Sequence, residues 1–199
     1  MRLLILTLLG WFTATGSTTV ITTVDDNKDL RPVAVYIPSH LFREDEYQVI
    51  IKVLERAEIP IVVVANDTTA AQGIDGLLVK PQALLKDITP ADFSAMVLIN
   101  GPGLVAYWKD TVLFNRCQNF TVKGRLIAAV ELAPLILARA GVLQNRSATV
   151  FPDFYCIRVL RENGARYRFS SVVRDGNIIT AAKAEDTHRL ARVLVRMLK

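Results

Sequence analysis

The stretch GRLIAAVELAPLILARAGVL, from Gly124 to Leu143, decides the fold of this chain. It opens with a short apolar run (126–130), continues with a helix-forming run (134–140) and stops at Gly141. A strand that turns directly into a helix places the residue at the joint at the carboxyl edge of a sheet, where open α/β folds keep their sites. That residue is the carboxylate Glu131, and a helix N-terminus favours negative charge. The stretch therefore predicts an α/β fold with a candidate site at Glu131.

The residues outside this stretch continue the alternation of strands and helices. Apolar runs rich in β-branched residues predict strands at 32–38, 59–65, 93–99 and 148–151. The spacing of apolar residues predicts helices at 44–57, 105–122, 154–163 and 186–198. Three connecting segments have their own patterns: a hairpin or edge strands at 66–80, a loop starting a short helix at 84–88, and a hairpin around Asp175-Gly176. The alternation favours a single doubly wound α/β domain, with a mostly parallel sheet and helices on both faces.

Length and composition limit the class of protein. At 199 residues the chain has the length of one domain, and 51% hydrophobic residues exclude a disordered chain. The formal net charge is +5, but the basic residues are spread out. Their densest group is Arg158, Arg161, Arg166 and Arg168. Because no basic run is interleaved with aromatic residues, we expect no nucleic-acid partner.

The N-terminus has the pattern of a secretory signal peptide. A basic head is followed by an apolar run (3–14) and small residues, so we expect a signal peptide at 1–16, a polar tether at 17–30 and the domain at 31–199. The apolar run is too short to span a bilayer comfortably, so we expect no membrane attachment after cleavage. The predicted location is secreted or periplasmic. The alternative is a cytoplasmic protein in which the N-terminal segment forms a first buried strand.

The two cysteines, Cys117 and Cys156, have no metal-ligand spacing. They either pair in an oxidising compartment or remain as packed, unpaired thiols. The two cysteines therefore predict no metal site, and we expect no cofactor.

Several segments, taken in order, resemble the ThiJ/PfpI family of the class I glutamine amidotransferase-like superfamily. They begin with Glu46 at the head of the first helix and continue with LERAEIPIVVV (54–64), LINGPG (98–103), KGRLIAAVELAPLILARAGVL (123–143), SATVFP (147–152), ENGARY (162–167) and VVRDGNIIT (172–180). No single motif is decisive, but their shared order is specific and covers nearly all of residues 32–198. The resemblance implies a flavodoxin-like fold.

The resemblance also implies a site. The family includes glyoxalase-, deglycase- and protease-like enzymes, chaperones and stress-response proteins, and many members are dimers, so we expect a homodimer. Its enzymes place a nucleophilic Cys on the strand-to-helix elbow, an acid from the first helix beside it, a Gly-rich turn facing it and often a His after the elbow helix. By position, the acid corresponds to Glu46, the turn to Gly101–Gly103, the elbow to Glu131 and the His to Phe151.

The elbow is where this chain departs from the family. Glu131 stands in the position of the Cys, and a carboxylate does not replace a thiolate in attack on a carbonyl. Cys117 and Cys156 lie on other predicted helices and are better explained as packed thiols. Phe151 is weaker evidence of lost activity, because family members that keep their Cys also have a Phe there.

The carboxylates Glu46 and Glu131 are expected to face each other across the family's pocket. At short range the pair shares a proton, and one apparent pKa rises. Three roles stay open: a structural hydrogen bond at an inactive elbow, a binding pocket for a small molecule or ion, and altered acid–base or metal catalysis with His40 as a third group. Gly101, Gly103, His40 and Phe151 would line this pocket, although the two glycines alternatively form only a tight turn.

The sequence thus predicts an exported ThiJ/PfpI-like domain without the family's Cys-dependent activity, a pseudoenzyme with a binding or stress-related role. Its possible partner is a small molecule. The alternative is a divergent hydrolase or lyase, glyoxalase-, deglycase- or peptidase-like, that uses the pair Glu46 and Glu131.

Overall fold

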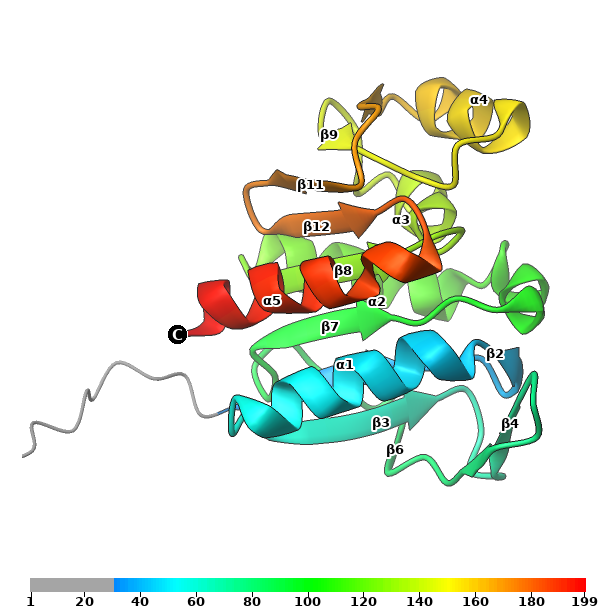
Figure 1. The fold of residues 1–199 in the computed structure, drawn as a ribbon, viewed down its shortest axis with the longest axis vertical. Helices are drawn as coiled ribbons and strands as arrows, with labels where there is room; N and C mark the ends of the chain where they lie inside the picture. The colour runs from blue at the N-terminus through cyan, green and yellow to red at the C-terminus, as the bar shows by residue number, and fades with distance from the viewer. Residues whose placement is uncertain (1–30) are drawn as a thin grey trace, which may run out of the picture.

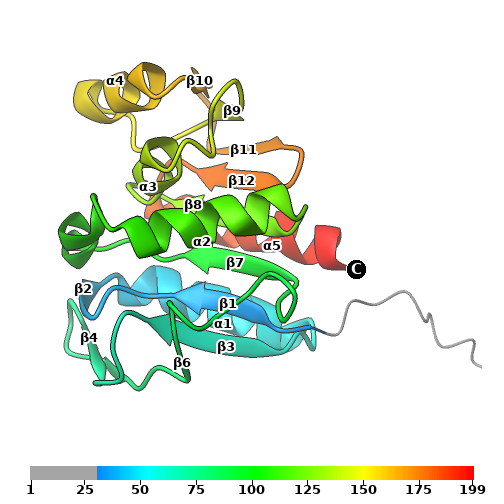
Figure 2. The same cartoon turned by 180° about the vertical axis from the view of Figure 1, so that it is seen from behind.

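The computed structural model describes residues 31–199, which form a seven-stranded sheet with helices on both faces (Figures 1 and 2). The strand order is β11-β12-β8-β7-β1-β3-β6. In chain order these strands are β1 (Val33–Tyr36), β3 (Ile61–Ala65), β6 (Ala83–Leu84), β7 (Ala95–Leu98), β8 (Leu126–Val130), β11 (Val172–Asp175) and β12 (Ile178–Ala181). Every pair is parallel except β11 with β12, which confirms the predicted fold class.

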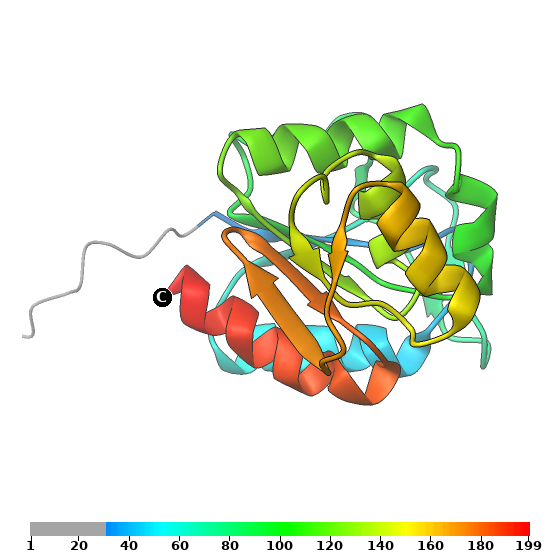
Figure 3. The same ribbon diagram turned by 90° about the horizontal axis from the view of Figure 1, so that it is seen from above.

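Each face of the sheet is covered by its own helices. One face carries α1 (Glu44–Arg56) and α5 (Thr187–Leu198), which contact each other. The other carries α2 (Thr111–Val122) and α3 (Pro134–Arg139), while α4 (Phe154–Glu162) packs on α3. Figure 3 shows the two layers from above. Because both faces are covered, β1, β7 and β8 are wholly buried, which explains why their sequences are continuous apolar runs.

Some predicted elements differ from the structure. Residues 83–84 form the edge strand β6 where a loop and helix start were predicted, because backbone bonds from Gln82 and Leu85 pair this segment with β3. The predicted strand 148–151 is reduced to β9 (Ser147–Ala148), which pairs with β10 (Arg166–Tyr167) outside the main sheet. Tertiary pairing with a free strand edge, which the local sequence does not encode, decides both.

The segment 66–80 does form two strands, as one of its predicted alternatives. These are β4 (Ala71–Gly73) and β5 (Leu78–Val79), and with β2 (His40–Phe42) they make a separate three-stranded sheet. The hairpin at Asp175-Gly176 joins β11 and β12, as predicted. The predicted signal peptide and tether, 1–16 and 17–30, lie outside the described residues. Within residues 31–199, no helix has the length and apolar character needed to cross a bilayer.

Candidate functional site

Glu131 lies at the sharp turn between β8 and α3. Its φ is +57°, a left-handed conformation that is uncommon for a residue other than glycine. Two backbone hydrogen bonds fix the turn: the Glu131 N–H donates to the Ala181 carbonyl, and the Glu131 carbonyl accepts from the Phe151 N–H, both at 3.0 Å. The strained conformation is thus held by β12 and by the loop after β9. Strained backbone conformations that are held by surrounding contacts are common at functional sites.

Glu46, in the first turn of α1, brings the second carboxyl group to this elbow. Its side chain is fully buried, and its Oε2 accepts a hydrogen bond from the Asn100 N–H at 2.9 Å. Burial is the main cause that raises the pKa of Glu46 well above its usual range. The hydrogen bond from the Asn100 N–H lowers this pKa, while the charge of Glu131 and a side-chain hydrogen bond with Glu131 raise it further. Glu46 Oε1 is buried and accepts no hydrogen bond from the described residues, and the raised pKa favours the protonated form of this carboxyl group beside Glu131.

Asn100 and Arg43 complete the surroundings of Glu131. The Asn100 Nδ2 group donates to Glu131 Oε2 at 2.9 Å, and Arg43 Nη1 lies 3.4 Å from the same oxygen. Arg43 also lies 3.8 Å from Glu46 Oε1 and forms a two-bond pair with Asp45. We call Arg43, Glu46, Asn100 and Glu131 the elbow cluster. The expected approach of Glu46 to Glu131 is present, and both carboxyl groups are held by partners.

The sequence analysis did not single out Arg43 or Asn100. A signal for each was present: Arg43 directly precedes the acidic first turn of α1, and Asn100 closely follows the end of β7, whose carboxyl end lies beside that of β8. What the sequence did not reveal is that both side chains turn towards Glu131.

Gly101 and Gly103 lie where the chain leaves β7, and a backbone approach explains both. A Cβ on Gly101 would lie 2.1 Å from the Leu41 carbonyl oxygen, and a Cβ on Gly103 would lie 1.7 Å from the His40 carbonyl oxygen. These glycines therefore let the 3₁₀ helix η1 (Pro102–Tyr107) pack on β2. Their role in packing is established by these distances and requires no ligand.

His40 and Phe151 flank the elbow cluster without joining it. His40 is exposed on β2, and among residues 31–199 no three His, Cys, Asp or Glu side chains lie close enough to hold a metal. The structure therefore does not form a metal site from Glu46, Glu131 and His40. Phe151 is 36% exposed and contacts the elbow through its backbone N–H.

The two cysteines are free, buried and unpaired. Burial raises the pKa of the Cys117 thiol far above its usual range. Burial, followed by the hydrogen bond that Cys156 Sγ donates to Asp153 Oδ2 at 3.1 Å, raises the pKa of Cys156 to about 12. Since the thiolate is the reactive species, neither cysteine supplies a nucleophile near neutral pH.

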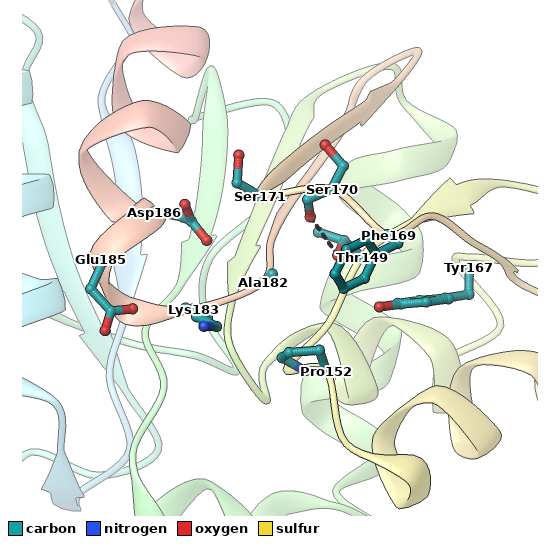
Figure 4. A pocket seen from close by; sticks show the side chains of 10 residues that line it. All are labelled: Thr149, Pro152, Tyr167, Phe169, Ser170, Ser171, Ala182, Lys183, Glu185 and Asp186. Carbon is teal, nitrogen blue, oxygen red and sulfur yellow. Dashed lines mark hydrogen bonds between the residues drawn. The ribbon is translucent and has the colours of Figure 1, made fainter.

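A cavity of about 380 Å³ lies beside the elbow (Figure 4). Phe151 and Ala181 form the backbone hydrogen bonds to Glu131, and the next residues in the chain, Pro152 and Ala182, line the cavity. In Figure 4, Pro152, Tyr167 and Phe169 stand on one side and Lys183 and Asp186 on the other. Neither Glu46 nor Glu131 lines it.

Three hydroxyl groups of the cavity, those of Thr149, Ser170 and Ser171, have partners within the protein. Thr149 Oγ1 donates to the Ser170 carbonyl at 2.8 Å, Ser170 Oγ donates to the Val172 carbonyl at 3.1 Å, and Ser171 Oγ accepts from Arg189 at 2.7 Å. Tyr167, Lys183, Glu185 and Asp186 also line the cavity, so it holds a phenol and charges of both signs.

Comparison with known proteins agrees with the fold. Residues 31–197 match the DJ-1/PfpI family. An uncharacterized protein of Methanocaldococcus jannaschii is 33% identical over 167 residues, which are 83% of this chain and 80% of that protein. A deglycase of Thermococcus kodakarensis is 26% identical over 165 residues, 81% of this chain and 89% of the deglycase.

Among solved structures, a ThiJ/PfpI domain protein from Brachyspira murdochii is similar with a TM-score of 0.80 at 23% identity, covering 84% of this chain and 95% of that chain. This chain belongs to the DJ-1/PfpI family. The match confirms both the family that the ordered segments predicted and the flavodoxin-like sheet.

Proposed function

We propose that this DJ-1/PfpI domain lacks the thiol chemistry that the family resemblance implies, and that it acts by binding. The observation that carries the proposal is the elbow itself. Glu131 occupies the turn, and its Oε2 is held by Asn100 and faced by Arg43. A carboxylate in this position does not form the thioester-type or thiohemiacetal bond that a thiolate forms with a carbonyl.

The rest of the elbow cluster supports the same proposal. The side chain of Glu46 is fully buried and that of Glu131 is 16% exposed, so a substrate would reach only one of the two carboxyl groups. The partners of Glu131 also neutralise or saturate its oxygen. A general acid or base must be within hydrogen-bond reach of the proton it transfers, and the buried partner does not meet this condition.

The test compares three versions of the full chain: the unchanged protein, Glu131→Gln and Glu131→Cys. Each is incubated with a dicarbonyl such as methylglyoxal and with a peptide substrate, and each is alkylated with iodoacetamide at pH 7.5. We expect no turnover by the unchanged protein and slow alkylation of its buried thiols, but fast alkylation at position 131 in Glu131→Cys. Turnover by the unchanged protein that disappears in Glu131→Gln would contradict the proposal.

A second candidate function is acid–base catalysis by the carboxyl pair. The observation that favours it is the raised pKa of Glu46 beside Glu131, because a carboxyl group that keeps its proton near neutral pH can act as an acid. Similarity to a deglycase points to carbonyl-containing substrates. This candidate predicts a bell-shaped dependence of rate on pH, which Glu46→Gln removes. A panel of such substrates without any pH-dependent turnover excludes it.

Export, assembly and a stress-related role complete the proposal and rest on the sequence. The N-terminal pattern at 1–16 supports a signal peptide, and the family resemblance supports a homodimer. Mass spectrometry of the mature N-terminus tests the first, and sedimentation velocity tests the second. An assay of aggregation suppression by the mature chain separates a chaperone-like role from binding of a small molecule.

A further inference from the structure

A groove of about 680 Å³, away from the elbow cluster, lies between η1, α3 and α4. Trp108 and Lys109 follow η1, Arg139 is the last residue of α3, and Tyr155 is in the first turn of α4. No member of the elbow cluster lines it. We call it the Trp108 groove.

Arg139 is held in this groove by aromatic side chains. Its guanidinium carbon lies 4.4 Å from the centre of the Trp108 ring, and its Nη2 donates to the Tyr155 hydroxyl at 3.1 Å. Tyr155 and Trp108 are themselves stacked, with ring centres 6.3 Å apart and planes at 23°. The guanidinium is therefore positioned at two points, and an arginine fixed in this way loses little further freedom when it binds a ligand.

The groove holds two cationic side chains and one indole N–H, and their anionic partners or acceptors within the described residues are few. Neither Arg139 nor Lys109 forms an ion pair within residues 31–199. The indole N–H of Trp108 is buried and finds no acceptor among the described residues. A ligand would reach this N–H only after a neighbouring side chain moves, but the two cations lie in the groove itself. Unpaired positive charge and unmet donors favour an anion.

The groove also offers apolar surface beside the charges. Val105 is 51% exposed and Tyr155 is 41% exposed, and both line it. An aromatic ring packs well against such a surface, and the guanidinium plane adds a stacking partner. The cavity of Figure 4 lacks this imbalance of charge, because Glu185 and Asp186 line it together with Lys183.

We propose that the Trp108 groove binds a small anion that carries a flat ring, with the anionic group on Arg139 and Lys109 and the ring against Tyr155 and Val105. The inference goes beyond the proposed function. It rests on side chains outside the elbow cluster, and it holds whether or not the elbow is catalytic.

The experiment titrates the full-length chain with three probes: AMP, which has both ring and anion, adenosine, which has the ring alone, and inorganic phosphate, which has the anion alone. Calorimetry measures affinity for the unchanged protein. Because the sequence has two tryptophans, the variant Trp11→Phe makes Trp108 the single emitter, and its fluorescence reports on the groove. We expect saturable binding of AMP with a change in Trp108 emission, and binding at least about tenfold weaker for each half-probe.

The variants locate the binding. Arg139→Gln should weaken AMP binding by about tenfold or more, because it removes a charge-assisted hydrogen bond. Lys109→Gln, at an exposed position, should weaken it by a smaller factor and gives a second test if Arg139→Gln folds poorly. Arg161→Gln is the matched control: Arg161 also lies over an aromatic ring, at 5.8 Å from Tyr167, but it does not line the groove.

Three outcomes would overturn the inference. One is the absence of saturable binding by all three probes up to millimolar concentration. The second is an equal effect of Arg139→Gln and Arg161→Gln. The third is a Trp108 signal that follows protein concentration in place of probe concentration, since a second copy of the chain would then cover the groove. AMP binding should persist in Glu131→Gln, which shows that binding in the Trp108 groove does not depend on the proposed role of the elbow.

Discussion

Two arginines, Arg43 and Arg139, occupy comparable places near the carboxyl ends of the parallel strands, yet their surroundings differ. Arg43 bonds to Asp45 and faces both carboxyl groups of the elbow cluster. Within residues 31–199, the partners of Arg139 are the Trp108 ring and the Tyr155 hydroxyl. The charge of the first arginine is engaged by carboxyl groups, whereas no carboxyl group of the described residues pairs with the second. We therefore expect changes in the elbow cluster to alter stability and changes in the Trp108 groove to alter binding.

The largest effect is expected from Glu46→Ala. It removes the acceptor of the Asn100 N–H and the partner of Glu131, and it leaves a cavity in a fully buried place, so unfolding should cost about 3 kcal/mol less than in the unchanged chain. Urea denaturation at pH 7 measures the difference. Glu46→Gln is the control, because its amide can donate to Glu131 and still accept from Asn100. If Glu46→Gln lowers the free energy of unfolding as much as Glu46→Ala does, the lost volume and hydrogen bonds do not explain the destabilisation.

Gly103→Ala should follow, with a loss of about 2–3 kcal/mol, since its Cβ would overlap the His40 carbonyl and backbone atoms must shift. Thermal unfolding measures it. Gly124→Ala is matched to it, because Gly124 has a φ of +72° with open space around its Cβ, and should cost only about 1 kcal/mol. Equal losses would refute the role of Gly103 in packing η1 on β2.

The pH dependence of stability tests the proton on Glu46. Because its pKa is raised in the folded chain, the folded state keeps a proton that the unfolded chain loses near pH 4.3. This contribution is fully present below that pH and declines as pH rises towards the folded pKa, by at most about 1.4 kcal/mol per pH unit. The difference in unfolding free energy between the unchanged chain and Glu46→Gln should therefore fall with rising pH above about 4.3. A difference that rises with pH, or does not change, contradicts a protonated Glu46.

The smallest effects concern the two arginines themselves. Arg43→Gln should cost no more than about 1 kcal/mol, because the side chain is 32% exposed and solvent screens its ion pairs. Arg139→Gln should change stability by less than about 0.5 kcal/mol, since it breaks no ion pair. Guanidinium chloride denaturation of both variants in parallel measures the contrast. A larger loss for Arg139→Gln than for Arg43→Gln would reverse the comparison between the two regions.

Much of the fold could be predicted from local sequence. The continuous apolar runs at 33–36, 95–98 and 126–130 predict buried parallel strands, since strands covered on both faces need no polar side. The edge strand β6 was not predicted, because its pairing depends on the free edge of β3 and on no pattern of its own. The position of Glu131 at the elbow followed from the strand-to-helix joint.

The candidate site could be predicted only in part. The approach of Glu46 to Glu131 was expected from the family resemblance. Arg43 and Asn100 were not expected, because the hydrogen bond from Asn100 spans 31 residues and depends on the neighbouring order of β7 and β8. In the same way, only the fold brings Arg139 and Tyr155 to the ring of Trp108.

The sequence by itself was enough for the parallel sheet, which follows from apolar runs, and for the family, which follows from the resemblance of its ordered segments; it also fixes a carboxylate, Glu131, at the elbow. Only the tertiary structure decided that burial raises the pKa of Glu46, that Arg43 lies among carboxyl groups and that Arg139, within residues 31–199, forms no ion pair. Protonation and pairing depend on burial and on distances between side chains from different elements, and these exist only once the sheet has assembled.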